Sequence, residues 1–404
     1  MGKHFISFLG TGAYQECIYS YGDKIGKKVV YIQDAFIDFF CGDFDKDDKI
    51  TIFLTAQAKA KHWDSLCEAI KSKKLRCILN PVDIIDSNTE ADIWGLFEQI
   101  YNEISIKDEI FFDLTHSFRY LPMLFFSILN YATYLKEIVV KGIYYGAWEA
   151  RNPESNVAPV FDLTQAYELM QWANAADVFT NYGITDKLAK CVKGTAREYL
   201  GTSGLIKQIE AISKNISCSR SIAILKGSLF SEVEKKIHDL PDSNVQPAFK
   251  PILKKVQDKI SGFDKDTALN FIPAVEWCVA HKMIPQGITM LQEGIISFVI
   301  DRHGFNYTDR ELRMALSSYF HKNEKGNFVE HESHSKYKEE LEKIFNDSLV
   351  NDLAPIYQSI TPTRNDINHG GTNESSSSST DKLFDKLKKR FEEVKDVFRK
   401  HDLL

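Results

Sequence analysis

An arginine and a histidine near the carboxyl end of the chain are the residues best suited to chemistry. Arg364 and His369 are separated by four residues within the segment Thr-Pro-Thr-Arg-Asn-Asp-Ile-Asn-His-Gly-Gly, which spans 361–371. A guanidinium is a permanent cation whose fork matches a phosphate, and an imidazole exchanges protons near neutral pH. Together they could cleave RNA without a metal, because the 2′-hydroxyl of RNA can serve as the nucleophile.

The same segment predicts the helix end that would position this pair. Thr361 could cap a short helix, and Pro362 suits its first turn. Gly370 and Gly371 suit the stop of that helix. The spacing alone also fits a solvated helix end, where His369 would favour the negative pole of the helix dipole.

The predicted chemistry needs no metal, and no metal site is predicted. Seven cysteines are scattered without a Cys-x-x-Cys pair, and the ligand-type residues at 331–334 lie in a charged, loop-like stretch. Asn365 follows Arg364 and could orient the guanidinium or bond a phosphate, with an exposed helix-surface amide as the alternative. Asn365 is therefore a third candidate catalytic residue beside Arg364 and His369.

Length and composition indicate a multidomain globular protein of the cytoplasm. A chain of 404 residues should form two or three domains, and 44% hydrophobic with 26% charged residues is ordinary for such proteins. The net charge of −6 argues against a strongly basic nucleic-acid scaffold but leaves room for a local basic cleft. The unpaired cysteines suit a reducing compartment. No membrane insertion is predicted, since the most apolar run, 120–135, is too short for a bilayer.

The first part of the chain predicts a Rossmann-like α/β domain over residues 1–160. Near-continuous apolar runs alternate with amphipathic stretches, a pattern typical of a largely parallel sheet covered by helices on both faces. Residues 14–21 could add a hairpin strand. Strands are expected at 4–9, 28–32, 49–54, 75–79, 109–114 and 138–145, and helices at 57–72, 90–104 and 118–136.

The second part, residues 161–404, predicts an all-α region. The polar, proline-containing stretch 149–159 is interpreted as the linker between the two parts. From residue 163 onward the apolar residues recur with helical periodicity, and no convincing strand pattern is present. A helical connector followed by a helical domain is therefore expected.

Polar residues gather where the expected parallel strands end, which is where open α/β sheets bind ligands. Gly10 and Gly12 would let backbone amides approach a phosphate or ribose. Arg119, at the start of a helix, would face negative charge, although Thr115 or Ser117 could equally be helix caps in a structural network. The candidate ligand-binding residues are Gly10, Thr11, Gly12, Thr55, Asn80, Asp113, Thr115, His116, Ser117 and Arg119.

Three motifs in this order resemble the CRISPR-associated CARF–HEPN proteins of type III systems, in particular the subfamily with an Asp-x-Thr-His-Gly motif. They are Gly-Thr-Gly at 10–12, Asp-Leu-Thr-His-Ser-Phe-Arg-Tyr-Leu-Pro at 113–122, and the Arg364/His369 pair. The helix expected from 283 onward resembles the one that opens the HEPN core. Ser117 departs from the subfamily glycine, which leaves the ring size of the ligand open.

The resemblance implies a homodimeric antiviral defence protein in which an amino-terminal CARF domain senses a cyclic oligoadenylate. Cyclic tetra-adenylate is the expected activator, with the hexa-adenylate second. The carboxy-terminal HEPN domain would be a single-strand endoribonuclease, leaving 2′,3′-cyclic phosphate ends. Two copies of Arg364 and His369 would converge on one phosphate across the dimer.

Three other functions fit the same residues. The CARF domain could itself degrade the cyclic messenger, with Thr11, Thr115, His116 and Ser117 positioning the attacking ribose hydroxyl. The chain could instead be a non-catalytic, ligand-responsive regulator, or a HEPN ribonuclease active without any nucleotide. RNA cleavage with and without a cyclic oligoadenylate separates these alternatives.

Overall fold

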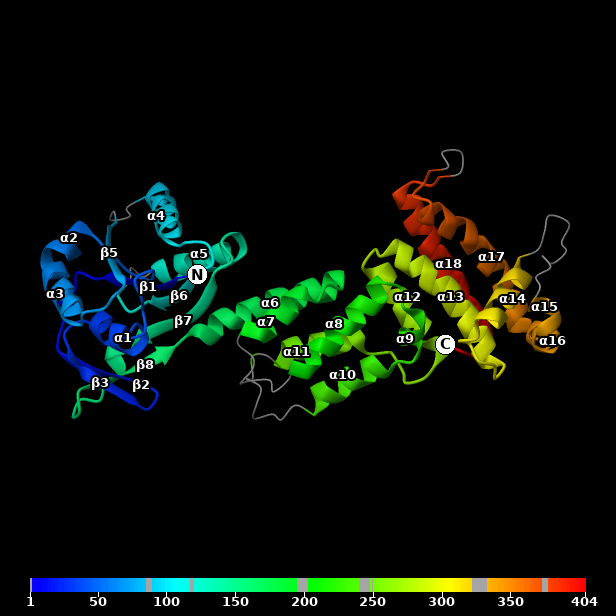
Figure 1. Ribbon diagram of the computed structural model, residues 1–404, viewed down its shortest axis with the longest axis horizontal. Coiled ribbons are helices and arrows are strands. Elements are labelled where there is room, and N and C mark those ends of the chain that lie inside the picture. The colour runs from blue at the N-terminus through cyan, green and yellow to red at the C-terminus, as the bar shows by residue number, and fades with distance from the viewer. Residues whose placement is uncertain are drawn as a thin grey trace. The chain divides into compact units, whose positions relative to one another are not determined.

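The structure is a computed structural model in which two compact units follow one another along the chain (Figure 1). The units are Met1–Glu168 and Leu169–Leu404. The described residues are 2–84, 89–116, 120–194, 203–239, 248, 250–321, 333–372 and 377–404.

The first unit is built on an eight-stranded sheet with the order β3-β2-β8-β7-β6-β1-β4-β5. The pairs β1/β4, β1/β6, β4/β5, β6/β7 and β2/β8 are parallel, whereas β2/β3 and β7/β8 are antiparallel. The prediction of a largely parallel α/β domain is therefore confirmed. The strands are β1 Lys3–Leu9, β2 Cys17–Tyr21, β3 Lys24–Val29, β4 Lys49–Leu54, β5 Ile78–Asp83, β6 Glu109–Asp113, β7 Val139–Gly146 and β8 Val157–Asp162.

Strand β1 lies in the interior of the sheet, so its alternate side chains are buried on both faces. Phe5 belongs to the apolar cluster that includes Phe36 of helix α1 (Ile32–Phe40), and Phe8 stacks on Phe53 and packs edge-on against Phe125 of helix α5 (Leu121–Leu135). Helix α3 (Asp64–Ser72) packs beside α1, and helix α4 (Glu90–Glu103) beside α5. This two-sided burial explains the near-continuous apolar runs of the parallel strands.

Three predictions about this unit are wrong in part. The strand predicted at 28–32 ends at Val29 as the last part of β3, and α1 follows because its apolar residues recur at helical spacing. The strand predicted at 75–79 begins later, as β5 Ile78–Asp83, and accommodates its proline at the sheet edge. The interpreted linker 149–159 contains part of β8, which pairs with β7 and completes the sheet.

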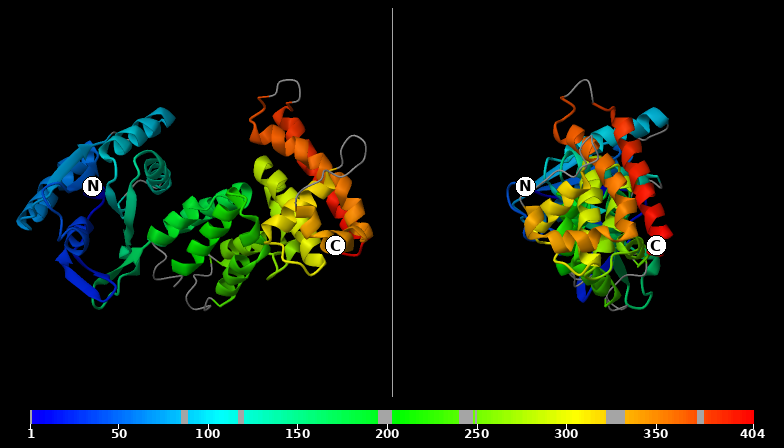
Figure 2. Two further views of the ribbon diagram at one scale, coloured as in Figure 1. Left: turned by 45° about the vertical axis from the view of Figure 1, so that its right-hand side comes forward. Right: turned by 90° about the vertical axis from the view of Figure 1, so that its right-hand side faces the viewer.

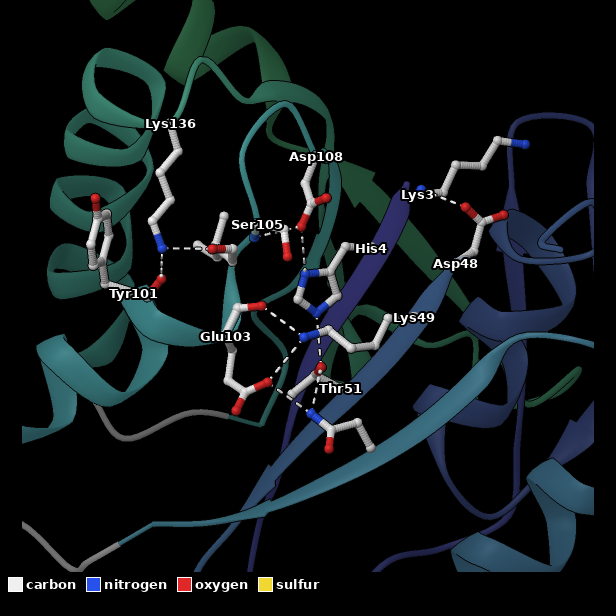
Figure 3. Close-up of polar contacts among 12 residues, drawn as sticks. Lys3, His4, Asp48, Lys49, Thr51, Tyr101, Glu103, Ser105, Asp108 and Lys136 are labelled. Carbon is white, nitrogen blue, oxygen red and sulfur yellow. Dashed lines mark hydrogen bonds and ion pairs between the residues drawn. The ribbon is translucent and has the colours of Figure 1, made fainter. Parts of the chain in front are cut away.

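A polar cluster at the amino ends of β1 and β4 holds this edge of the sheet together (Figure 3). Buried His4 lies between Thr51 Oγ1, 2.8 Å from Nε2, and Asp108 Oδ2, 3.5 Å from Nδ1. Lys49 Nζ donates to the backbone and the carboxylate of Glu103 at 2.7 and 3.0 Å. Burial lowers the pKa of His4, which favours the neutral imidazole that shares a hydrogen bond with Thr51.

The regular elements described in the second unit are all helices, as predicted (Figure 2). Helix α13 is central, with buried residues on every side, and contacts α12, α14, α17 and α18. The helices are α6 Thr164–Tyr182, which begins in the first unit, α7 Asp186–Gly194, α8 Ser203–Ser217, α9 Ser221–Leu225, α10 Ser228–His238, α11 Lys250–Ile260, α12 Phe271–Ala280, α13 Ile284–Arg302, α14 Arg310–Phe320, α15 Ser333–Lys336, α16 Lys338–Phe345, α17 Ser348–Asn368 and α18 Thr380–Lys400.

The helix that carries the Arg364/His369 pair is longer than predicted. Helix α17 contains Pro362 in its interior, so Thr361 is not its cap. Asp347 caps the helix instead, accepting a hydrogen bond from the amide of Leu349 at 3.0 Å. The predicted stop is confirmed, because Gly370 has φ +62° and Gly371 has φ +68°, in the left-handed region that favours glycine.

Candidate functional site

A small cavity of about 240 Å³ opens where the parallel strands β1, β4 and β6 end. Five of the predicted ligand-binding residues meet in its wall: Gly10, Thr11, Thr55, Thr115 and His116. The remaining described wall residues are apolar, namely Phe8, Leu9, Ile84 and Leu121. The carboxyl edge of a parallel sheet is where such folds bind ligands, so this cavity is the first candidate site.

Gly10 is placed where a larger residue would crowd the cavity. A Cβ built at this position would lie 3.3 Å from Tyr14 Oη and 3.4 Å from His116 Cβ. The amide of Gly10 donates to Tyr14 Oη at 2.9 Å. The expected approach of this amide to a phosphate therefore requires Tyr14 to give way.

Two basic residues that sequence reasoning missed hold the loop after β1. Lys61 Nζ donates to the carbonyl of Thr11, and His62 Nε2 to the carbonyl of Gly12, both at 2.9 Å. Both residues belong to a π-helical turn, Lys59–Trp63, a rare conformation that is frequent at functional sites. The signal in the sequence was a Lys-x-Lys-His run directly after the strand that ends before Thr55.

Asp113 supports the cavity from behind rather than lining it. Its fully buried carboxylate accepts hydrogen bonds from Ser7 Oγ at 2.7 Å and from the amide of Thr115 at 2.8 Å. Thr115 Oγ1 in turn accepts from the amide of Gly146 at 2.9 Å. Burial raises the pKa of the Asp113 carboxyl to about 6, although its hydrogen bonds oppose the change.

His116 and Thr55 give the cavity neutral hydrogen-bonding groups. Burial, with a smaller contribution from His62, lowers the pKa of the His116 imidazole to about 4, so the ring is neutral at pH 7. The ring packs edge-on against Tyr14, with centroids 4.8 Å apart. Thr55 caps the helix that follows β4, accepting from the amide of Ala58 at 3.2 Å. A neutral imidazole and a hydroxyl can recognise the edges of a base or the hydroxyls of a ribose.

The other predicted ligand-binding residues lie elsewhere. Asn80 is inside β5, so its predicted place after a strand is wrong. Its amide donates to Glu103 Oε2 at 2.8 Å in the cluster at the opposite strand ends. Gly12 is exposed and does not line the cavity. Ser117 and Arg119 lie outside the described residues.

The second candidate site surrounds Arg364 of α17. Its Nη1 donates to Gln292 Oε1 at 3.1 Å, and its Nη2 lies 3.5 Å from Glu293 Oε1, both on the central helix α13. The other oxygen of Glu293 accepts from Arg313 Nη2 of α14 at 2.6 Å. Glu293 is thus shared by two guanidiniums, and both arginines line a cavity of about 750 Å³.

A chain of hydrogen bonds anchors the residue that holds Arg364. Gln292 Nε2 donates to Thr361 Oγ1 at 2.8 Å, and Thr361 Oγ1 lies 2.9 Å from His321 Nε2. His321 Nδ1 lies 2.7 Å from the carbonyl of Ser317, which can only accept, so Nδ1 carries the proton and Nε2 accepts from Thr361. Thr361, predicted as a helix cap, therefore positions Gln292.

His369 and Asn365 are both exposed at the end of α17. His369 is the first residue beyond the helix, and its amide donates to the carbonyl of Asn365 at 2.9 Å. A separation of five residues on a helix corresponds to about 140° of rotation and about 7.5 Å of rise. Arg364 and His369 of one chain therefore leave α17 in different directions.

Among the described residues, three or more histidine, cysteine, aspartate or glutamate side chains nowhere gather in a way that could hold a metal ion. Within the same part of the chain, none of the helices combines the length and apolar character needed to cross a membrane.

Comparisons with known proteins agree with this architecture. Residues 4–149 match the family described as "CRISPR system endoribonuclease Csx1, CARF domain", and residues 168–267 match "CRISPR-associated protein MJ1674, second domain". The chain is 29% identical over 240 residues to the CRISPR-associated protein MJ1674 of Methanocaldococcus jannaschii. That match covers 57% of this chain and 36% of the relative, so the chain spans about a third of that protein's length.

The first match covers the α/β unit from β1 through β7 and includes the cavity, and the second begins where the helical unit begins. Neither match extends to α13 or α17, so the Asp-x-Thr-His-Gly subfamily and the HEPN assignment stay predictions. The amino-terminal unit is therefore similar to a CARF domain, and the chain resembles a CRISPR-associated protein.

Proposed function

We propose that this protein is a single-strand endoribonuclease activated by a cyclic oligoadenylate in type III CRISPR antiviral defence. The observation that carries the proposal is the cavity at the ends of β1, β4 and β6, in a domain matched to the CARF domain of an endoribonuclease family. Cyclic tetra-adenylate is the expected ligand, with the hexa-adenylate second. Gly10, Thr11, Thr55, Thr115 and His116 would contact the ligand, supported by Asp113 from behind.

In this proposal a second copy of the chain completes the ligand site. Helices α4 and α5 carry several exposed large apolar side chains, and Leu121 at the start of α5 lines the cavity. They are Trp94, Met123, Tyr131 and Tyr134. A two-fold symmetric cyclic nucleotide favours one arrangement of two copies, and it can activate only by binding that arrangement better than the resting one.

Cleavage is assigned to Arg364 and His369, with Asn365 in support, as in a HEPN domain. His369 would take the proton of the 2′-hydroxyl or protonate the departing 5′-oxygen, and Arg364 would stabilise charge on the phosphorane. The products would be a 2′,3′-cyclic phosphate and a 5′-hydroxyl, with no metal required. Because the two side chains leave α17 in different directions, one phosphate would be served by Arg364 of one copy and His369 of the other.

The test is cleavage of a fluorescent single-stranded RNA by the full chain, with each cyclic oligoadenylate in turn and with excess chelator. Rapid cleavage only with the cyclic tetra- or hexa-adenylate, unchanged by chelator, is the expected result. Equal cleavage without nucleotide would contradict activation, and no cleavage with any nucleotide would contradict the enzyme. Analysis of the nucleotide after the reaction shows whether the CARF domain also degrades its ligand.

A further inference from the structure

The cavity beside Arg364 is much larger than one guanidinium needs. Its volume of about 750 Å³ lies in the range of sites that hold organic ligands. The walls come from two groups of helices in the second unit: the turns around α9 and α10, and the core helices α13, α14 and α17. A residue in the helical connector, which spans 163 to about 240 and includes α9 and α10, can therefore meet a molecule that also touches Arg364.

The charge of the cavity wall is strongly positive although the whole chain is acidic. Arg220, Lys226, Arg313 and Arg364 line the cavity, and Glu293 is the one carboxylate in the described wall, giving a formal charge of +3. The net charge of the chain is −6. Such a local excess of positive charge attracts anions and concentrates them at the wall.

Two of these cations are available to a ligand. Arg313 and Arg364 share Glu293, but neither Arg220 nor Lys226 has an ion-pair partner among the described residues. Both side chains are exposed and lie on the turns at either end of α9. An ion pair with an exposed cation is weak unless several cations act on one anion, which a polyanion makes possible.

The chemistry of the remaining wall indicates which polyanion fits. The uncharged polar wall residues are serine, threonine and asparagine, such as Thr289, and no aromatic side chain is among the described wall residues. Proteins that read unstacked bases use aromatic platforms, whereas cations and hydroxyls contact phosphates and riboses. The wall therefore suits a sugar–phosphate backbone and not the bases.

We infer that this cavity binds the phosphodiester backbone of single-stranded RNA next to the scissile phosphate, through Arg220 and Lys226. The inference rests on the proposed ribonuclease activity and extends it into the connector, which would then contribute to the substrate site. Because the described wall residues include no base-stacking group, this contact should hold RNA without regard to sequence. Specificity for particular bases would have to arise elsewhere.

The test is the binding of a fluorescein-labelled, 2′-O-methylated single-stranded RNA to the full chain, measured by anisotropy at several salt concentrations. The 2′-O-methyl group removes the nucleophile, so binding is separated from cleavage. The double variant Arg220→Ala/Lys226→Ala should bind this RNA about 10- to 30-fold more weakly near 0.1 M salt. The slope of log affinity against log salt concentration should become shallower by about 1.4. Circular dichroism and the melting temperature show that each variant is folded.

A matched control removes the same charges elsewhere in the same unit. Lys207 on α8 and Arg310 on α14 are exposed and do not line the cavity, so Lys207→Ala/Arg310→Ala should leave both affinity and slope within about twofold of wild type. Equal losses in the two double variants would overturn the inference by showing a general charge effect.

Two more outcomes separate this inference from the proposed function. If Arg364→Ala abolishes cleavage but the Arg220/Lys226 double variant binds RNA like wild type, the inference fails while the ribonuclease stands. If the double variant loses affinity for labelled cyclic tetra-adenylate instead of RNA, the cavity is a nucleotide site and the inference also fails. If Arg364→Ala leaves cleavage intact, the proposed function itself is wrong.

Discussion

The two candidate sites of this protein differ in how they present polar groups. The cavity of the CARF domain has no charged side chain in its described wall, and its histidine is kept neutral by burial. The described wall of the cavity in the helical unit has four cations against one carboxylate. The first is suited to recognition by shape and hydrogen bonds, and the second to attraction of a polyanion.

This difference follows from how each site is built. Parallel strand ends place backbone groups and short side chains around the first cavity, and the hydrogen bonds of Asp113, Lys61 and His62 fix the loops. Packed helices place long side chains around the second, where Glu293 and Gln292 hold Arg364. A selective sensor gains from a rigid neutral pocket, whereas a nuclease that accepts many RNA sequences gains from charge.

The largest expected effect is loss of cleavage at the helical site with the sensor intact. Arg364→Ala and His369→Ala should each lower the rate of activated RNA cleavage by about 100- to 10,000-fold, because general acid–base and electrostatic catalysis are lost. Initial rates with fluorescent RNA measure this change. Binding of cyclic tetra-adenylate, measured by calorimetry, should be unchanged, and a variant that retains most of its cleavage would refute the assignment.

The next largest effect concerns the sensor and compares His116 with Asn80, which were both predicted to bind the ligand. His116→Ala should weaken cyclic tetra-adenylate binding by about 10- to 100-fold, because a neutral hydrogen-bonding ring leaves the cavity wall. Asn80→Ala is the matched control, since Asn80 lies in β5 and contacts Glu103. Equal losses in calorimetry for the two variants would contradict the placement of the ligand.

Salt should separate the two sites without any mutation. Between 50 and 200 mM salt, RNA affinity should fall by about 20-fold if three net charges are used, whereas cyclic tetra-adenylate affinity should fall only a few-fold. Anisotropy with labelled RNA and labelled nucleotide gives both slopes. A steep dependence for the nucleotide would mean that cations outside the described cavity wall contact its phosphates.

The smallest expected effect is a pH dependence of stability from Asp113. Its pKa is raised from an ordinary 3.8 to about 6, so its stabilising contribution is complete below the ordinary value and is lost as pH rises through about 6. The loss corresponds to about 3 kcal/mol at most. Asp113→Asn keeps a similar shape and removes the charge, so it should melt at a higher temperature than wild type at pH 7.5, with the difference vanishing near pH 4. If the difference in melting temperature between Asp113→Asn and wild type stays constant from pH 4 to pH 8, the buried carboxylate does not lose its proton in this range.

Much of this architecture could be predicted because strands and helices differ in the spacing of their apolar residues along the chain. Apolar runs located most of the central strands, and helical spacing identified the second unit. The residues at the ends of β1, β4 and β6 were found because strand ends converge in a parallel sheet. Asn80 was misplaced because a proline inside an edge strand resembles the end of that strand.

Residues that act through tertiary contacts could not be predicted in this way. Lys61 and His62 hydrogen-bond a loop 50 residues earlier in the chain, and the sequence pattern does not show which segment they contact. Gln292, Glu293 and His321 are ordinary helix residues in the sequence, and only the packing of α13, α14 and α17 brings them to Arg364 and Thr361. Local propensity carries no information about such long-range contacts.

The most direct test of the central claim is to mix two inactive variants, Arg364→Ala and His369→Ala, with cyclic tetra-adenylate and fluorescent RNA. If one phosphate is cut by Arg364 of one copy and His369 of the other, mixed dimers regain one complete pair. An equimolar mixture should then recover on the order of a quarter of the wild-type rate, because half of the dimers are mixed and each restores one of two pairs. No recovery, although native mass spectrometry shows that mixed dimers form, would contradict the account.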